Sequence, residues 1–454
     1  MAKIHIKNLG PIQDVEFDIK NFNVFIGEQA VGKSTICKAI YFFRLFRDNH
    51  IDYLYSVATK GIDTEIRFPK VMNAQNKKNF IDIFGPSWNL DENLQITYTY
   101  NDIIEISVSL SASSDRKFID IRYKKGIDKI RQIEKEMESY HRKRSKQMLA
   151  KNINETLNRN FIDAEDIRLY NELNQQIGRI FGDNMPTYYI PAGRILLSLM
   201  CNLLPVSNSL VANTENEIYS VLDFINRKFI DIVRKNQNKF IGGISHLYKH
   251  YDKKDKFYTD DLPKEIIDCV KGEYRFDGKE ECIVTDDGQK IPINFISSGQ
   301  QEALWLFNLL YMWLLQDEKA FVIIEEPEAH LHPTLQYDIV KFIAEFANLT
   351  DSTILITTHS PYILTSANLL LYGGKIVEKN KGEVAKILGE HKYIIPKECN
   401  VFEIQQNGTT KLHSLKDDDY RESLEVEKLD KISDDINEKY TKLVYLEDEI
   451  EWLL

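Results

Sequence analysis

The segment Gly27–Ser34 constrains the fold of this chain more than any other part of its sequence. It reads Gly-Glu-Gln-Ala-Val-Gly-Lys-Ser and satisfies the phosphate-loop pattern G-x-x-x-x-G-K-[ST] without a mismatch. Residues 23–26 predict a short buried strand before it, and residues 34–43 predict a helix after it. These flanking elements disfavour the alternative, a glycine-rich turn with an incidental lysine. The sequence therefore predicts an α/β fold in which this segment is a phosphate loop.

The residue types of the phosphate loop suit a nucleoside triphosphate and its metal ion. Glycines let the backbone turn tightly, so that N–H groups point at phosphate oxygens beside a helix N-terminus. Lys33 is expected to reach the β and γ phosphates, and Ser34 to ligate Mg²⁺. We therefore expect ATP and Mg²⁺ as ligands. The residues expected to contact ATP here are Gly27, Glu28, Gln29, Ala30, Val31, Gly32, Lys33, Ser34 and Thr35.

Two adjacent carboxylates, Glu325 and Glu326, follow a second apolar segment, residues 321–324, which predicts another buried strand. Because side chains alternate along a strand, the two acids can take different roles. Glu325 is expected near the Mg²⁺, through water, and Glu326 beside the water that attacks the γ-phosphate. The alternative is a solvated acidic turn, but two acids and a proline seldom end a buried strand by chance.

Histidines follow two of the predicted strands. Residues 353–358 predict a third buried strand, which brings His359 to the edge of the sheet where ligands bind in open α/β folds. A histidine there is more often structural, but its place after the other motifs favours contact with the γ-phosphate or its attacking water. His330 and His332 could form a metal pair. We interpret them as contacts between subunits, because no third ligand of matching character lies nearby in the sequence.

The order and spacing of these motifs, together with Ile296-Ser-Ser-Gly-Gln300, resemble the ABC class of AAA family ATPases. The fitting branch contains structural-maintenance, recombination-repair and overcoming-lysogenization-defect ATPases, and the run Glu-Glu-Pro-Glu-Ala-His-Leu-His-Pro is typical of the last group. The resemblance implies an α/β head with a mixed central sheet, an antiparallel side sheet and an inserted helical, short coiled-coil subdomain. Two residues depart from the class: Ser298 replaces a common second glycine, and Glu325 replaces a common aspartate.

In that class, a serine–glycine signature of one protomer contacts the γ-phosphate bound by the other. The signature residues of this chain are Ser297, Ser298, Gly299 and Gln300, at the N-terminus of a predicted helix. The resemblance implies ATP hydrolysis by a homo-oligomer built from head dimers. It also places His332 where relatives have a dimer-contact aspartate, and His359 at the switch histidine. By the same resemblance Arg194 would lie near the nucleotide, although an arginine after such a turn is as often a structural ion-pair partner.

Composition is that of an ordinary globular protein, with 43% hydrophobic and 28% charged residues. The apolar runs are too short for a membrane span, and residues 304–315 predict a core helix. Five cysteines without paired spacing favour a reducing compartment and disfavour structural zinc, so we expect a cytoplasmic protein with no membrane partner. The net charge of -11 disfavours sequence-independent binding of nucleic acid by the whole surface.

Residues 126–182 predict a helical insertion. Four of its apolar residues recur three, four and three positions apart, as in a coiled-coil seam. These are Ile130, Ile133, Met137 and Tyr140. Residues 126–151 carry eight Lys or Arg against four Asp or Glu, which suits DNA or an acidic partner and equally suits a solvated helix face. Residues 227–256 interleave basic and aromatic residues, which suits phosphate contact, although helical aromatic residues more often belong to a core.

Antiparallel strands are predicted on both sides of the insertion. Residues 94–100 and 103–110 predict a hairpin that turns at Asn101 and Asp102. Residues 281–293 predict another, with its turn at residues 287–288. The first hairpin is expected in the side sheet, and the second leads into the signature.

The sequence therefore predicts four parts, and the last shapes the functional hypothesis. They are residues 1–125, the first half of the head with the phosphate loop and side sheet; 126–182, the insertion; 183–365, the second half of the head; and 366–454, a small α/β extension. In the last part, residues 375–387 and 401–415 predict strands, and residues 429–440 an amphipathic helix. The acidic cluster Asp417–Asp419 is better explained as a helix cap or a solvated loop than as a nuclease centre.

A head without a nuclease motif resembles the ATPase subunit of two-gene anti-phage systems such as PARIS, Septu and the abortive-infection type L pair. The resemblance implies a separate nuclease or toxin effector that the ATPase oligomer holds or activates, with a phage protein or DNA as the trigger. The alternative is a DNA-repair or recombination ATPase that binds DNA directly. A third possibility is a binding module in which ATP is a structural ligand.

Overall fold

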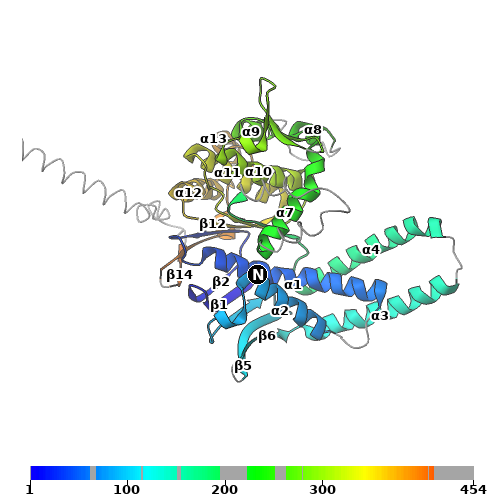
Figure 1. Cartoon of the computed structure of the whole chain (residues 1–454). Coiled ribbons are helices and arrows are strands. Elements are labelled where there is room, and N and C mark those ends of the chain that lie inside the picture. Colours follow the sequence, from blue (N-terminus) through cyan, green and yellow to red (C-terminus); the bar gives the residue numbers. More distant parts are fainter. Residues whose placement is uncertain are drawn as a thin grey trace, which may run out of the picture.

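A six-stranded sheet forms the centre of the structure, a computed structural model that describes residues 2–61, 68–113, 116–150, 155–194, 222–250, 262–278, 280–406 and 408–413 (Figure 1). The strand order is β14-β13-β3-β12-β11-β7. Only β14 runs antiparallel to its neighbour. The strands are β3 (Phe22–Ile26), β7 (Thr187–Ile190), β11 (Phe321–Glu325), β12 (Thr353–Thr358), β13 (Cys399–Ile404) and β14 (Thr410–His413). The three buried strands predicted around the motifs are therefore confirmed.

Successive side chains of the central strands enter two different hydrophobic cores. In β3, Val24 belongs to one core and Phe25 to the other, and in β12 Ile354 and Leu355 divide in the same way. A sheet covered on both faces consists of nearly continuous apolar strands, which explains why these segments are apolar throughout. The mixed α/β fold class predicted from the motifs is confirmed.

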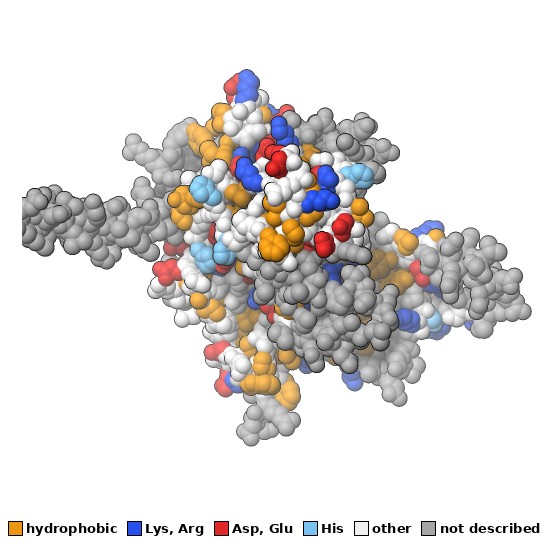
Figure 2. All heavy atoms as spheres, turned by 45° about the horizontal axis from the view of Figure 1, so that its top comes forward, with side chains coloured by type: hydrophobic (Ala, Val, Ile, Leu, Met, Phe, Trp, Pro, Cys, Tyr) orange, Lys and Arg blue, Asp and Glu red, His pale blue; other side chains and the backbone are white. Residues whose placement is uncertain are grey.

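Helices cover the upper face of the sheet in Figure 1. They are α7 (Phe224–Gln237), α8 (Ile244–His250), α9 (Leu262–Val270), α10 (Ser298–Leu315), α11 (Pro333–Thr350), α12 (Pro361–Ile376) and α13 (Lys381–Leu388). Phe229 and Phe240, from the mixed stretch 227–256, are fully buried in this core, so these two aromatic residues serve packing. On the face shown in Figure 2, basic and acidic side chains are interspersed among the residues drawn in colour.

Two antiparallel sheets flank the centre. The side sheet has the order β2-β1-β4-β5-β6, and a second sheet has the order β10-β9-β8. Both predicted hairpins are present, as β4 paired with β5 and as β9 paired with β10. The bounds are β1 (Lys3–Leu9), β2 (Ile12–Asp18), β4 (Gln95–Thr99), β5 (Glu105–Ser113), β6 (Arg116–Lys125), β8 (Glu273–Phe276), β9 (Glu281–Val284) and β10 (Lys290–Pro292). Short 3₁₀ helices lie at Ser87–Asn89, Asn238–Phe240, Ile293–Phe295 and Pro396–Glu398.

The helical insertion consists of α3 (Ile127–Ala150) and α4 (Glu155–Phe181), and both pack against α1 (Lys33–Lys60), which lies between them in Figure 1. The apolar residues Ile130, Ile133 and Met137 are buried in the core that contains α1. Tyr140, the fourth residue of the repeat, donates a hydrogen bond to Glu165 of α4 at 2.6 Å. The apolar repeat therefore buries α3 beside α1. Helix α2 (Lys70–Phe84) also packs on α1.

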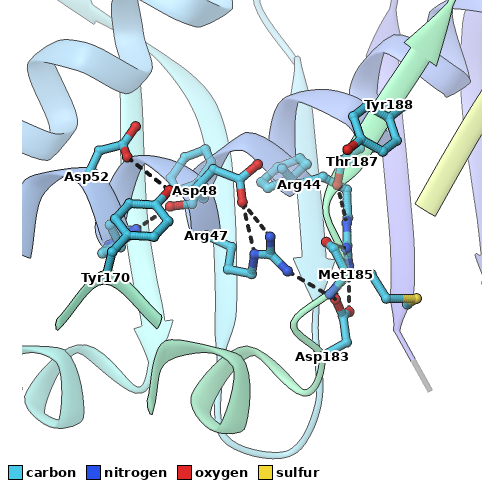
Figure 3. A network of polar contacts seen from close by, with 12 residues as sticks. Arg44, Arg47, Asp48, Asp52, Tyr170, Asp183, Met185, Thr187 and Tyr188 are labelled. Atoms are coloured by element: carbon cyan, nitrogen blue, oxygen red, sulfur yellow. Dashed lines mark hydrogen bonds and ion pairs between the residues drawn. The ribbon is translucent and has the colours of Figure 1, made fainter. Parts of the chain in front are cut away.

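A buried arginine fastens α1 to the point where the insertion returns to the head (Figure 3). Arg44 donates to both carboxylate oxygens of Asp183, at 2.5 and 2.8 Å, and to Thr187 Oγ1 at 3.0 Å. Its guanidinium also lies over the ring of Phe321, 4.5 Å from the centroid. Burial alone would raise the pKa of Asp183, but Arg44 and Arg47 outweigh it and lower that pKa. This contact joins α1 to the segment that leads from the end of α4 into β7.

Residues 366–413 contribute strands to the central sheet and helical residues to the core that covers its upper face. The strand predicted over residues 375–387 is wrong, because α12 and α13 occupy this region. The buried residues of α12, such as Ile363, Ala367 and Leu370, recur at helical spacing. Strand β13 pairs with β3 inside the central sheet. The acidic cluster 417–419 and the predicted helix 429–440 lie outside the described residues. Among the described residues, none of the helices is long and apolar enough to cross a bilayer.

Candidate nucleotide site

The phosphate loop joins β3 to α1, as predicted. Gly27 and Gly32 both have positive φ, 152° and 106°. A Cβ at Gly32 would lie 2.5 Å from Ile12 Cδ1, so that side chain would have to move, and the positive φ itself favours glycine there. Gly32 is the N-cap of α1 and supplies no side-chain cap. The N-terminus of this helix therefore offers its first-turn N–H groups to an anion, and the loop fits a phosphate.

Lys33 lies at the centre of the loop with only 5% of its surface exposed. Its ammonium donates to the carbonyl oxygens of Gly27 at 2.7 Å and Glu28 at 2.6 Å. It lies 3.0 Å from His359 Nδ1. Burial lowers the pKa of Lys33, and Glu326 opposes that effect. The loop carbonyls and the histidine thus hold the ammonium where a phosphate would meet it.

His359 connects Lys33 to the acidic pair, Glu325 and Glu326. Its Nε2 lies 2.6 Å from Glu326 Oε1. Because an ammonium can only donate, Nδ1 is the acceptor, which assigns the ring proton to Nε2 and makes Glu326 its acceptor. This hydrogen bond raises the pKa of His359 and lowers the pKa of Glu326. The structure therefore brings three predicted residues into one hydrogen-bonded series, which we name the Lys33–His359–Glu326 chain.

Glu328 also shapes this site, although the sequence analysis assigned it no role. Its Oε1 accepts from Thr358 Oγ1 at 2.6 Å and from the His359 N–H at 2.9 Å. Its Oε2 has no hydrogen-bond partner among the described residues. Glu328 thus fixes the backbone that carries the histidine. The sequence offered one indication of this role. Glu328 lies only two residues after Glu326 in the Glu-Glu-Pro-Glu run, so its side chain can reach the same strand ends.

Glu325 points toward a different neighbour from Glu326. Its carboxylate accepts from the Tyr189 hydroxyl at 2.7 Å and from the Ala192 N–H at 3.3 Å. Burial raises the pKa of Cys37, which lies one turn beyond Ser34 on α1. The nearby charge of Glu325 raises that pKa further, so Glu325 lies close to α1. A hydroxyl and a carboxylate are the hard oxygen donors that Mg²⁺ prefers. The described residues hold no cluster of three His, Cys, Asp or Glu side chains that could bind a metal ion.

Arg194 lies behind the acidic pair, completely buried. It forms an ion pair with Glu302 at 3.0 Å and donates to backbone carbonyls, including those of Glu325 and Glu326. Of the two interpretations given by the sequence, the structure favours the internal ion-pair partner. Its guanidinium holds the backbone of the residues that are expected to act on ATP.

The signature Ile296–Gln300 begins α10 at an exposed helix N-terminus. Ser297 is the N-cap, and it forms a capping box with Gln300. The side chains of Ser297 and Ser298 are exposed. A Cβ at Gly299 would lie 2.9 Å from the carbonyl oxygen of His330, so the signature packs against the loop that carries the paired histidines. His332 is the N-cap of α11. The signature and both histidines therefore belong to adjoining parts of the head.

Comparison with protein families gives one match that covers most of the chain. The family described as "AAA domain, putative AbiEii toxin, Type IV TA system" matches residues 22–365. Protein ea59 of Escherichia phage lambda is 33% identical over 69 residues, which cover 15% of this chain and 13% of that protein. The match thus spans only a small part of this curated relative.

Among solved structures, the SMC head domain from Thermotoga maritima covers 91% of this chain and 98% of its own, with 10% identity and a TM-score of 0.36. The Smc head domain with a coiled coil and joint derived from Pyrococcus yayanosii covers 96% and 100%, with 12% identity and a TM-score of 0.38. The recombination mediator RecF bound to ATPγS covers 90% and 97%, with 10% identity and a TM-score of 0.31.

Proposed function

The chain belongs to this AAA-domain family, and we propose that it binds and hydrolyses ATP as a dimer of ABC-type heads. The observation that carries the proposal is the Lys33–His359–Glu326 chain. It places three groups together at the mouth of the phosphate loop: the Lys33 ammonium, which would bind phosphate, the His359 ring and the ionised Glu326 carboxylate. The ammonium lies 3.0 Å from Nδ1 of the ring, and Nε2 lies 2.6 Å from the carboxylate. These are the groups that phosphoryl transfer to water needs, a charge clamp and a residue that positions the attacking water.

Each member of the chain has a definite task in hydrolysis. Lys33 exchanges its loop carbonyls for the β and γ phosphate oxygens. The side chain of Glu326 is 31% exposed and its pKa is lowered, so it is ionised and accessible to a water molecule. His359 donates to Glu326 and fixes the direction of its carboxylate. Ser34 and Glu325 would hold Mg²⁺, which supplies charge neutralisation at the phosphates.

The exposed signature supports a site shared between two protomers. Ser297 caps and Ser298 begins an 18-residue helix, both residues are exposed, and a helix N-terminus carries a partial positive charge. Anions bind favourably at such a position, and the phosphate of a second copy has the matching charge. His330 and His332 adjoin this surface, which fits a contact between heads. Neither signature then completes its own site, so turnover depends on assembly.

Control of a separate effector is the wider proposal. The family's description names a toxin of a toxin–antitoxin system, which supports a role in bacterial defence. In that role, ATP-dependent closure of the heads holds or releases a nuclease or toxin, and a phage protein or DNA provides the trigger. Direct DNA binding, as in a repair ATPase, is tested by adding duplex DNA, because a repair enzyme would hydrolyse ATP faster in its presence.

Two variants test the ATPase and the dimer. Lys33→Ala is expected to abolish ATP binding in calorimetry, and Glu326→Gln to bind ATP and accumulate as dimers in light scattering. Glu383→Gln is the matched control, since this exposed carboxylate on α13 pairs only with a surface lysine, at 2.7 Å, in the contacts described. Its turnover and mass should equal those of the unmodified protein. Monomeric Glu326→Gln protein in saturating ATP would contradict the dimer, and unchanged turnover in that variant would contradict the assigned chemistry.

A further inference from the structure

The guanidinium of Arg194 organises the backbone of the acidic pair. Its Nη1 donates to the carbonyl oxygen of Glu325 at 2.8 Å, and its Nη2 to that of Glu326 at 3.0 Å. Nη1 also donates to the carbonyl of Pro191 at 2.9 Å. A guanidinium presents its N–H groups in a rigid plane, so three acceptors bound to it keep fixed relative positions. Arg194 therefore sets the backbone from which Glu326 reaches His359.

Another partner of this arginine comes from the signature helix. Glu302 is 1% exposed, and its Oε2 pairs with Arg194 Nε at 3.0 Å and accepts the Arg194 backbone N–H at 3.2 Å. The carbonyl oxygen of Glu302 accepts from Nε as well, at 3.0 Å. Glu302 lies four residues after Ser298, about one turn of α10. One helical turn thus connects the signature to the arginine that holds the acidic pair.

A second contact joins the same two regions. The backbone of Gly299 lies so close to the carbonyl oxygen of His330 that an added Cβ would approach it to 2.9 Å. The loop that carries His330 follows the acidic pair directly. Because packed interiors do not deform continuously, a displacement of α10 moves Arg194 and this loop together. The signature and the catalytic carboxylate of one protomer are therefore mechanically connected inside that protomer.

We propose that Arg194 is a positioning residue that couples the two ATP sites of the dimer. The proposal rests on the shared sites proposed above, in which the signature of one protomer contacts the ATP of its partner. That contact fixes α10, the ion pair with Glu302 fixes Arg194, and Arg194 holds Glu326 in the position that hydrolysis needs. ATP in each site thereby activates the other site, so hydrolysis is cooperative.

The first test is Glu302→Gln, which keeps the shape and an oxygen acceptor but removes the charge. We expect kcat to fall by about tenfold to a hundredfold through misplacement of Glu326. KM for ATP should change little, and the Hill coefficient should fall from near 2 to about 1. Arg44→Lys is the matched control, since it changes a buried arginine ion pair that contacts neither Glu302 nor the acidic pair in the contacts described. It should lower the melting temperature and leave the Hill coefficient unchanged.

A second test needs no change in the buried pair. Protomers with Ser298→Arg are mixed with protomers with Lys33→Ala, so that one composite site remains in each mixed dimer. That site uses the Glu326 of a protomer whose own signature has no ATP to contact. The proposal predicts a rate per site about a tenth of the unmodified rate or less, within the usual range of coupling.

The outcomes separate the two proposals. Mixed dimers that form with ATP and hydrolyse at the full rate per site would overturn the coupling and leave the shared site intact. The coupling would also be overturned if the Glu302→Gln protein had a lower melting temperature but still hydrolysed ATP cooperatively. If ATP produces no mixed dimers in light scattering, the shared site itself is wrong.

Discussion

Two buried arginines lie near the two ends of the short strand β7, and they hold different parts of the molecule in place. Arg44 lies before the strand, where it binds Asp183 and Thr187 and covers the ring of Phe321 at the start of β11. Arg194 lies after the strand, where it binds the carbonyls at the end of β11. Both are charged groups withdrawn from water and satisfied by a carboxylate and by backbone oxygens.

The difference between them is the edge of the sheet that each serves. Ligands in open α/β folds bind at the carboxyl ends of parallel strands. Arg194 is at that edge, so its hydrogen bonds hold the backbone of the residues proposed to act on ATP. Arg44 is at the opposite edge, and its hydrogen bonds join α1 to residues 183–187, which lead from the insertion into β7 (Figure 3). The same kind of buried arginine therefore holds architecture together at one edge and, in the proposed function, positions a reaction at the other.

The largest expected effect is at the carboxyl edge. Glu326→Gln removes the group that we propose positions and deprotonates the attacking water, and we expect turnover to fall by about 10²-fold to 10⁴-fold. The melting temperature should change little, because this side chain is part of the accessible mouth of the site. Steady-state ATP hydrolysis and thermal unfolding measure the two quantities. A loss of stability that parallels the loss of turnover would assign Glu326 to architecture and break the comparison.

Glu328→Gln sharpens this result. The variant keeps an oxygen to accept from Thr358 and the His359 N–H, so positioning is largely preserved. We expect a loss of turnover well below that of Glu326→Gln. An equal loss would mean that the second acid has the chemical role.

The second effect is at the opposite edge. Arg44→Met leaves Asp183, whose side chain is 26% exposed, with only Arg47 at 3.6 Å as a cationic partner, and losing the main partner should cost about 1–3 kcal/mol of unfolding free energy. Urea unfolding measures the loss, and the double variant Arg44→Met with Asp183→Asn should recover part of it. Turnover of the folded protein, assayed well below its melting temperature, should stay within about twofold. A specific loss of kcat without loss of stability would place Arg44 in the catalytic machinery.

Sequence patterns predicted what short-range constraints determine. Three features follow from patterns shorter than ten residues: the phosphate loop, the apolar strand before the acidic pair and the strand before His359. Periodicity and motif spacing are therefore enough to predict them. The partners of the two arginines come from distant parts of the chain, with Arg44 and Asp183 139 positions apart and Arg194 and Glu302 108 apart. No local pattern encodes such pairs. For the same reason, β13 could not be placed beside β3. The strand predicted at 375–387 is a different kind of miss, because apolar residues of α12 recur at helical spacing just before it.

The third effect compares two neighbouring tyrosines of β7. The Tyr189 hydroxyl donates to Glu325 at the carboxyl edge, with an oxygen–oxygen distance of 2.7 Å. The Tyr188 hydroxyl donates to Glu318, away from the acidic pair, at 2.6 Å. Tyr189→Phe and Tyr188→Phe should each cost at most about 1.5–3 kcal/mol of unfolding free energy. Only Tyr189→Phe should raise the Mg²⁺ concentration needed for half-maximal ATP hydrolysis, because it frees Glu325. Equal Mg²⁺ requirements would remove Glu325 from the metal site.

The last comparison concerns a pH dependence confined to the carboxyl edge, which should be small near neutral pH. The hydrogen bond with Glu326 raises the pKa of His359 above its ordinary value, so the ring gains its second proton at a higher pH than a free histidine. That proton goes to Nδ1, which then faces the Lys33 ammonium at 3.0 Å and can no longer accept from it. Turnover should therefore fall about tenfold per pH unit below the raised pKa, starting above pH ~6.5. His359→Gln keeps a donor and an acceptor without titrating, so its lower activity should be flat over the same range. An acidic limb that persists in this variant would assign the proton to another group.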